Sequence, residues 1–238
     1  MKRVVVPCSP AFAGSLRIWL TLLAACGSNL EAAPERTVKL VPITDALCVT
    51  KGAAKVGATV VEPTMRAVAL GSHGDGAQLD WIYRGETETT RELASGSARR
   101  QVGLKLRAQN GCNLIYVMWR LDPKPMLEVS IKHNPGKATH AECGADGYTK
   151  IKATKSWAVP ILAAGDRHTL RAVIAGDELT AWIDDKVAWR GTLPEIARSL
   201  AGPAGIRSDN LSFDLVGFSA TPEEAAAAAT CRRDAGET

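Results

Sequence analysis

Short hydrophobic runs alternate with polar positions from about residue 37 to residue 219. β-Branched residues are frequent within the runs, and Gly, Pro, Asn and Asp separate them. Successive side chains of a strand point to opposite faces, so these runs predict half-buried strands. Runs at this close spacing are typical of an all-β, antiparallel jelly-roll β-sandwich. The predicted strands are 37–42, 46–51, 56–61, 65–70, 78–83, 101–108, 113–121, 127–132, 147–152, 168–175, 178–184, 187–190 and 211–219.

Two turns near the C-terminal end of this region predict an antiparallel meander. Residues 169–174 turn at Gly176-Asp177 into 178–183, and a second turn at 184–186 leads into 187–189. Gly and Asp are the residues that tight hairpin turns favour.

Helical spacing is found in only two places. Residues 193–200 place Pro194 near the start of an apolar pattern and Gly202 after its end, which predicts one short helix before the last strand. The C-terminal tail, 221–238, begins with a Thr-Pro-Glu-Glu capping signature before five alanines and predicts a further helical turn.

The two strands of the hairpin at 113–132 can pair in two ways, which differ in which side chains share a face of the sheet. If Leu121 faces Leu127, the aliphatic side chains share one face, and Arg120 lies opposite Glu128. A slip by one residue would bring charges into the core at several kcal/mol each, so we expect the first register. The core face then carries Ile115, Val117, Trp119, Leu121, Leu127, Val129 and Ile131, and the other face carries Tyr116, Met118, Arg120, Glu128, Ser130 and Lys132.

The N-terminus has the pattern of an export signal. A basic start precedes an apolar stretch at 18–25 and then Cys26. Leu23-Ala24-Ala25-Cys26 resembles the lipobox of bacterial lipoproteins, which implies cleavage before Cys26 and lipidation of its thiol. The alternative is an ordinary signal peptide with a chance cysteine. We therefore predict a signal peptide at 1–25, a tether at 26–36, a sandwich at 37–220 and a tail at 221–238.

Charge and location follow from this assignment. Three of the 29 Lys and Arg residues, and none of the 25 Asp and Glu residues, lie in the first 25 positions, so the remaining chain is nearly neutral. No bulk field therefore favours nucleic acid. The residue after Cys26 is Gly27, which lacks the aspartate of inner-membrane retention signals, so a cell-envelope protein of the outer membrane is expected, attached to the membrane through its lipid.

Four cysteines remain after Cys8 is removed and Cys26 is lipidated. They are an even set in an oxidising compartment, for which three pairings are possible, and the alternative is four free thiols. The hairpin register places Cys112 opposite residues near 136, so the loop carrying Cys143 returns to it. We expect Cys112–Cys143 and, by elimination, Cys48–Cys231. The second pair suits a jelly roll whose first and last strands are neighbours.

The last quarter of the chain resembles a known superfamily. The stretches Arg167–Leu170, Gly176–Asp184, Trp189–Gly191 and Gly202–Asn210 are similar to the closing strands of concanavalin A-like lectin/glucanase domains, most of all the laminin-G-like and 3-keto-disaccharide-hydrolase-like modules. The resemblance implies a jelly roll with a concave sheet that many relatives use for glycans. It also implies a possible glycosidase, but the acidic Glu-x-Asp-x-Glu strand of hydrolytic relatives is missing.

A polar group on the face of the 113–132 hairpin is the main candidate site. Glycan sites combine an aromatic ring with fixed charged hydrogen-bond partners, and this group has both. The alternative is a solvated face with an Arg120–Glu128 pair. The expected ligand-binding residues are Tyr116, Arg120, Glu128, Lys132 and His133, joined by His140 and Glu142 from the following loop.

Other chemistry has little support in the sequence. No nucleophile elbow, zinc-protease motif or phosphate-binding glycine loop is present, so no catalytic residue and no cofactor are assigned. Residues 71–76 around His73 and Asp75 allow a calcium loop, but one Asp carries too little charge, and a flexible surface loop is the preferred interpretation. Trp81, Trp157, Trp182 and Trp189 are expected mainly in the core.

Two functions are therefore carried forward, and the third alternative is a purely structural envelope protein, which needs neither a cleft nor a binding groove. The first is a lipid-anchored carbohydrate-binding or interaction module without catalytic machinery. The second is a periplasmic or surface glycoside hydrolase on the same fold. A hydrolase needs a deep cleft with a carboxylate of raised pKa, whereas a binding module needs only a shallow groove with exposed aromatic side chains.

Overall fold

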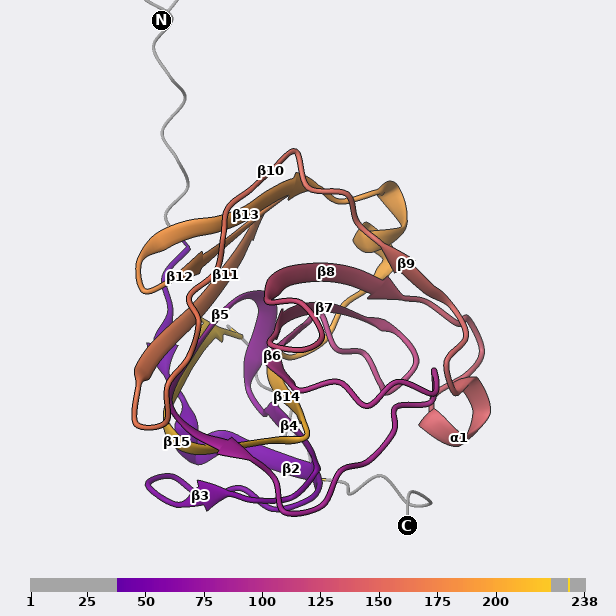
Figure 1. Cartoon of the computed structure of the whole chain (residues 1–238). Coiled ribbons are helices and arrows are strands. Elements are labelled where there is room, and N and C mark those ends of the chain that lie inside the picture. The colour runs from indigo at the N-terminus through magenta and orange to yellow at the C-terminus, as the bar shows by residue number, and fades with distance from the viewer. Residues whose placement is uncertain (1–37, 224–230, 232–238) are drawn as a thin grey trace, which may run out of the picture. The chain divides into compact units, whose positions relative to one another are not determined.

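A computed structural model describes residues 38–223 and Cys231. Every strand pairing within this part of the chain is antiparallel. The strands form two sheets that pack face to face, and the chain crosses repeatedly between them (Figure 1). The fold is the expected antiparallel jelly-roll β-sandwich. The predicted signal peptide, Cys26, the tether and most of the tail lie outside the described residues.

The two sheets are assembled from strands distant in sequence. The eight-stranded sheet contains, in order, β1 (Val41–Pro42), β15 (Leu211–Pro222), β5 (Ser72–Glu86), β11 (Arg167–Ala175), β12 (Glu178–Ile183), β13 (Lys186–Thr192) and β10 (Lys155–Ser156), with β3 (Thr59–Val60) also paired to β15. The seven-stranded sheet contains β2 (Leu47–Lys51), β4 (Thr64–Ala69), β14 (Gly205–Asp209), β6 (Gln101–Leu106), β7 (Leu114–Arg120), β8 (Met126–Lys132) and β9 (Tyr148–Lys150).

Alternate side chains of both sheets meet in one core. Trp81 of β5 and Trp119 of β7 are fully buried and pack edge to face across the two sheets, with ring centres 5.5 Å apart. Trp189 joins this core, whereas Trp182 is half-buried beside Arg171 and Trp157 is exposed. Each large apolar side chain buried in this way contributes roughly 1.5–3 kcal/mol to stability.

The β7–β8 hairpin has the predicted faces but a different register. Trp119 lies opposite Leu127 and Arg120 lies opposite Met126. The expected register, with Arg120 opposite Glu128, is therefore wrong by two residues. A shift of two residues keeps every side chain on its face, so burial alone does not distinguish the two registers. Glu128 lies opposite Met118 instead, where β9 also reaches it.

The predicted meander of β11, β12 and β13 is confirmed. Ala175 pairs with Glu178 around Gly176, and Ile183 pairs with Lys186 around Asp184 and Asp185. Gly176 and both aspartates have positive φ, the conformation that tight hairpin turns require.

The helices differ from the prediction. Residues 195–199 form a 3₁₀ helix, η2 (Glu195–Ser199), and not an α-helix. It precedes β14, a strand missing from the prediction, so it is not directly before the last strand. A second 3₁₀ turn, η1 (Thr44–Ala46), follows β1. The α-helix of the described region is α1 (His140–Cys143), in the predicted loop after β8. Because α1 has a single turn, it has no repeating apolar pattern by which a sequence can reveal it.

Both predicted disulfides are present, Cys48–Cys231 and Cys112–Cys143. The second joins the start of β7 to the end of α1. No helix within residues 38–223 combines the length and the hydropathy needed to cross a bilayer.

Candidate functional site

Two adjoining cavities lie on the outer face of the seven-stranded sheet, the face turned away from the core. Their volumes are about 190 and about 350 Å³. Strands β6 to β9 and β14 form the floor, and loop 91–99 and α1 form the walls. Figure 1 shows α1 on the side of this sheet that faces away from β11, β12 and β13. The residues shared by both cavities are Leu93, Ala94, Tyr116, His140, Tyr148 and Arg207.

The alternation of the strands places the floor residues. On β7, Val117 and Trp119 point into the core, so Tyr116 and Met118 point to the outer face. On β14, Ile206 points into the core and Arg207 to the outer face. The wall partly covers the expected open face, so Tyr116 is only 5% exposed.

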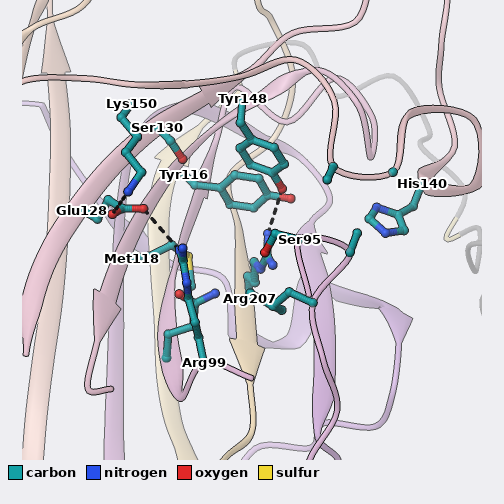
Figure 2. Close-up of a pocket in the computed structure, with 15 residues that line it drawn as sticks. Ser95, Arg99, Tyr116, Met118, Glu128, Ser130, His140, Tyr148, Lys150 and Arg207 are labelled. Atoms are coloured by element: carbon teal, nitrogen blue, oxygen red, sulfur yellow. Dashed lines mark hydrogen bonds and ion pairs between the residues drawn. The ribbon is translucent and has the colours of Figure 1, made fainter. Parts of the chain in front are cut away.

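Tyr148, Tyr116 and Arg207 form one stack at the centre of the site (Figure 2). The two tyrosine rings are nearly parallel, with centres 6.0 Å apart, and the Arg207 guanidinium carbon lies 4.7 Å from the centre of the Tyr116 ring. Arg207 Nη1 also donates a hydrogen bond of 3.1 Å to the hydroxyl of Tyr148. Tyr148 is 40% exposed, so it is the ring of this stack that a ligand can reach.

Burial and the neighbouring cations shift the pKa values of the two tyrosines in opposite directions. Burial raises the pKa of Tyr116 well above its usual value. Burial also acts to raise the pKa of Tyr148, but the cations of Arg207 and Lys132 outweigh it and lower this pKa below 10.

Asp209 fixes the position of Arg207. Its carboxylate accepts hydrogen bonds from Arg207 Nε at 2.9 Å, Arg66 Nη2 at 2.5 Å and the Gln101 amide at 2.7 Å. Burial acts to raise the pKa of Asp209, but Arg207 and Arg66 lower it to about 2. Burial disfavours the Arg207 cation, yet Asp209 keeps the pKa of Arg207 above its usual value. Both groups are thus charged around neutral pH.

Glu128 is surrounded by cations. It lies 2.9 Å from Lys150 Nζ, 3.5 Å from Arg120 Nη1 and 3.7 Å from Arg99 Nη1. Figure 2 shows its carboxylate between Lys150 and Arg99. Three cations around one carboxylate leave this end of the cavity positively charged.

Loop 91–99 is attached to the sheet by the side chain of Asn210, which follows β14. The Asn210 amide nitrogen donates to the carbonyl oxygens of Arg91 and Arg99 at 2.8 and 3.0 Å, and its oxygen accepts from the Arg91 N–H at 2.7 Å. The loop therefore has a fixed position above the cavities, where it supplies Leu93, Ala94 and Ser95.

Three of the seven predicted ligand-binding residues line the cavities, namely Tyr116, Glu128 and His140. His140 reaches the wall because the Cys112–Cys143 disulfide attaches α1 to β7.

The other four predicted residues lie outside the cavity lining. Arg120 packs against Met126 and Glu128 at the end of the hairpin. Lys132 is fully buried and not on an open face, because α1 and β9 cover it, and its Nζ donates to the Gly144 carbonyl at 2.8 Å. His133 is half-buried, with its N–H bonded to Gly147. Glu142 caps α1 by accepting from Thr139 and Ala138, and these bonds lower its pKa to about 2.

Sequence reasoning missed the residues that organise the site. Arg207 and Asp209 lie in the Gly202–Asn210 stretch, but all five residues of β14 are buried, and its sequence Gly-Ile-Arg-Ser-Asp lacks the apolar-polar alternation that predicts a strand. Tyr148 and Lys150 lay in a predicted strand, but nothing in the sequence indicated that this strand pairs with β8. Arg99 lies in loop 91–99, whose sequence has no periodic pattern of hydrophobic residues.

The expected loop around His73 and Asp75 is part of the long strand β5. Asp75 forms ion pairs with Arg107 and His73. Within the described residues no group of three or more His, Cys, Asp or Glu side chains is placed to hold a metal ion.

Comparison with known proteins identifies similar folds only. No protein-family model and no curated protein matches this sequence. Similar solved structures include the carbohydrate-binding module CBM66 from Bacillus subtilis, with a TM-score of 0.49 and 10% identity, covering 73% of this chain and 91% of that one. A tetrameric galectin from the ball sponge Cinachyrella sp. has a TM-score of 0.42 and 13% identity, covering 67% and 99%. The Crh5 transglycosylase in complex with NAG has a TM-score of 0.41 and 14% identity, covering 79% and 85%. With TM-scores below 0.5, these similarities say nothing about the ligand or activity of this chain.

Proposed function

We propose that this protein is a carbohydrate-binding protein of the cell envelope, anchored by a lipid at Cys26, and that its ligand binds in the two cavities on the outer face of the seven-stranded sheet. The observation that carries the proposal is the Tyr148–Tyr116–Arg207 stack in the floor shared by both cavities. It offers an exposed ring beside hydrogen-bond donors of fixed orientation, the combination that sugars need.

The cavities offer a ligand both apolar and polar contacts. Leu93, Ala94 and Met118 supply apolar surface for the C–H groups of a sugar ring. Gln101 and Ser130 supply hydrogen-bonding groups that suit hydroxyls. Because the strands and the Asn210 bonds hold these groups in place, binding orders few side chains and loses little entropy.

The carboxylates favour binding over hydrolysis. Glycoside hydrolysis requires one carboxyl group to donate a proton, which needs a raised pKa, and a second carboxylate at a set separation. Asp209 has a pKa of about 2 and stays ionised around neutral pH, so it does not act as a general acid. Glu128 is engaged in ion pairs with Lys150, Arg120 and Arg99.

The lipid anchor rests on the Leu23-Ala24-Ala25-Cys26 motif. A lipid at Cys26, followed by a short tether to the sandwich, would hold the protein at a membrane where envelope glycans are close. The glycine at position 27 favours the outer membrane.

A glycan array with the protein purified in detergent tests the binding function. We expect binding to a restricted set of glycans, reduced at least about tenfold by Tyr148→Ala, which removes the exposed ring. Trp157→Ala is the matched control, because Trp157 is equally exposed but lies next to β10 of the other sheet. Absence of binding to any glycan, or equal binding by Tyr148→Ala, refutes the proposal.

A further inference from the structure

The lining of the two cavities carries a marked excess of positive charge. Over the whole chain, 29 Lys and Arg residues face 25 Asp and Glu residues. The cavities concentrate this excess. Among the described residues, the basic lining side chains are Lys51, Arg66, Arg91, Arg99, Lys105, Lys150 and Arg207, and the acidic ones are Glu92, Glu128 and Asp209. Of these, Arg66, Arg99, Lys150 and Arg207 form defined ion pairs with Asp209 and Glu128.

Arg207 is the most buried arginine of this set. It is 9% exposed, its Nε is held by Asp209 and its Nη1 by the Tyr148 hydroxyl. Its Nη2 makes no hydrogen bond to any residue of the described region. Because Arg207 lines both cavities, a guanidinium edge of defined orientation faces the space where a ligand binds. A guanidinium in such a position binds carboxylate and sulfate groups strongly and directionally.

The carboxylate of Asp209 does not cancel the positive charge around Arg207. It lies between two arginines, so the Arg66–Asp209–Arg207 group carries a net positive charge. A second positive group lies at the other end of the first cavity, where Lys150 and Arg99 share Glu128. The Lys150 side chain is 66% exposed and is the outermost part of this second group.

We propose that the ligand is an acidic glycan whose carboxylate or sulfate binds Arg207, with the adjoining sugar ring against Tyr148 and a second anionic group near Lys150 and Arg99. This inference rests on the proposed carbohydrate-binding function and adds the charge of the ligand. Two positive groups separated along one depression match a chain of acidic sugars better than a single small anion, because successive sugars repeat the anionic group at intervals.

Paired acidic and neutral glycans test the charge. The purified protein is titrated with a galacturonic acid oligosaccharide and its carboxyl-reduced form, and with a heparin-derived oligosaccharide and its desulfated form. We expect binding to at least one acidic member, at least about tenfold weaker binding of its neutral partner, and loss of affinity between about 50 and about 500 mM NaCl. The pair that binds identifies the anionic group as carboxylate or sulfate.

The outcomes separate this inference from the proposed function. Equal binding of neutral and acidic members, or binding on the array to neutral glycans alone, overturns the acidic ligand but leaves glycan binding in place. No binding to any glycan overturns both.

Charge-balanced variants test the role of Arg207. Arg207→Gln alone leaves Asp209 with one arginine fewer and risks misfolding, so the double variant Arg207→Gln/Asp209→Asn is used, which leaves the net charge unchanged. We expect the double variant to show a cooperative thermal unfolding transition, which demonstrates that it is folded. We expect its affinity for the acidic glycan to be at least about tenfold lower. Unchanged affinity in the folded double variant would overturn the assignment of Arg207.

Variants of Lys150 and Arg99 provide a second measurement, which leaves the buried Arg66–Asp209–Arg207 group intact. These two residues are called the rim of the site. Lys150→Gln and Arg99→Gln should each weaken the acidic glycan several-fold and flatten its salt dependence. The matched controls are Lys186→Gln and Arg167→Gln, which remove the same charges from exposed positions of the eight-stranded sheet. If the controls weaken binding as much as the rim variants, the effect is one of overall charge and the site assignment is wrong.

Discussion

Asn210 makes a reciprocal pair of hydrogen bonds with the backbone of Arg91, accepting from its N–H at 2.7 Å and donating to its carbonyl at 2.8 Å. A third bond, to the Arg99 carbonyl, attaches the other end of loop 91–99. Asn210 has a φ of 53°, a left-handed conformation that asparagine tolerates better than most residues. One side chain thus both turns the chain between β14 and β15 and positions the wall of the site.

Replacing Asn210 should release this loop. Asn210→Gly keeps the backbone conformation accessible but removes three hydrogen bonds, and we expect a loss of about 2–3 kcal/mol of stability. Amide hydrogen exchange should accelerate at Arg91 and at the N–H groups of residues 93 and 96, which form the loop's internal turn. Unchanged protection in this loop would show that Asn210 does not hold it. Asn210→Ala should cost about 1 kcal/mol more, because alanine is strained at positive φ.

The two disulfides should affect stability and binding differently. Their sequence separations of 31 and 183 correspond to about 4 and about 5 kcal/mol in the chain-entropy estimate. Cys112→Ala/Cys143→Ala should lower the Tm and also weaken glycan binding, because α1 carries His140 into the cavity wall. Cys48→Ala/Cys231→Ala should lower the Tm at least as much but leave the affinity of the folded protein unchanged. Equal effects of the two pairs on affinity would contradict the role given to α1.

Asp209 should make stability depend on pH in the acid range. Its pKa in the fold is about 2, below the ordinary 3.8, so its ionised form stabilises the fold above about pH 4. This contribution, about 2 kcal/mol, should disappear as the pH falls from about 4 to about 2.

Asp209→Asn isolates that contribution. At pH 7 the variant should be less stable than the wild type in urea unfolding, and the difference should shrink toward pH 2, where the wild-type carboxylate is protonated. Asp185→Asn, at an exposed turn position, is the control and should keep the wild-type pH profile. A difference between Asp209→Asn and wild type that does not vary with pH would contradict the assigned pKa.

Lys132 should behave as a core residue. Its side chain is fully buried. Its Nζ donates to the Gly144 carbonyl and lies 5.2 Å from the centre of the Tyr148 ring. Lys132→Ala should therefore cost about 2–3 kcal/mol, through the cavity it leaves and the lost hydrogen bond.

Two further variants calibrate that loss. Lys132→Met keeps the aliphatic chain and should recover part of the stability. Arg120→Ala should cost under about 1 kcal/mol, because Lys150 continues to pair with Glu128. Chemical denaturation measures all three, and a Lys132→Ala variant as stable as Arg120→Ala would show that Lys132 is dispensable for packing.

Cys26→Ala should release the protein from membranes. The thiol at position 26 is the predicted site of lipidation, and acyl chains hold a protein at a bilayer because each buried methylene adds about 0.8 kcal/mol. Cell fractionation should find the variant in the soluble fraction, and mass spectrometry should find an acyl mass on the N-terminal peptide of the wild type only. A wild-type peptide without that mass, together with a variant that still sediments with membranes, would refute the anchor.

The sequence by itself determined the fold class, the faces of the strands and the disulfide partners. Alternation between Val117, Trp119 and their polar neighbours is set by burial, and a strand has only two faces, so the hairpin's faces were predictable. The Cys112–Cys143 bridge was predicted from a register that placed Cys112 opposite residues near 136. The observed register shifts that pairing by two residues, yet the loop after β8 still returns to Cys112 and the bridge forms. The meander around Gly176 and Asp184 followed from local turn chemistry.

The tertiary structure alone decided which residues meet at the site. Arg207, Tyr116 and Tyr148 lie on three strands far apart in sequence, and their stack exists only because β14 pairs with β6 and β9 pairs with β8. Periodicity describes which way a side chain points from its own strand, but it contains no information on the order of strands in a sheet. For the same reason the pattern of the β7–β8 hairpin was compatible with two registers, and only the structure shows that Glu128 lies opposite Met118 and pairs with Arg120 diagonally.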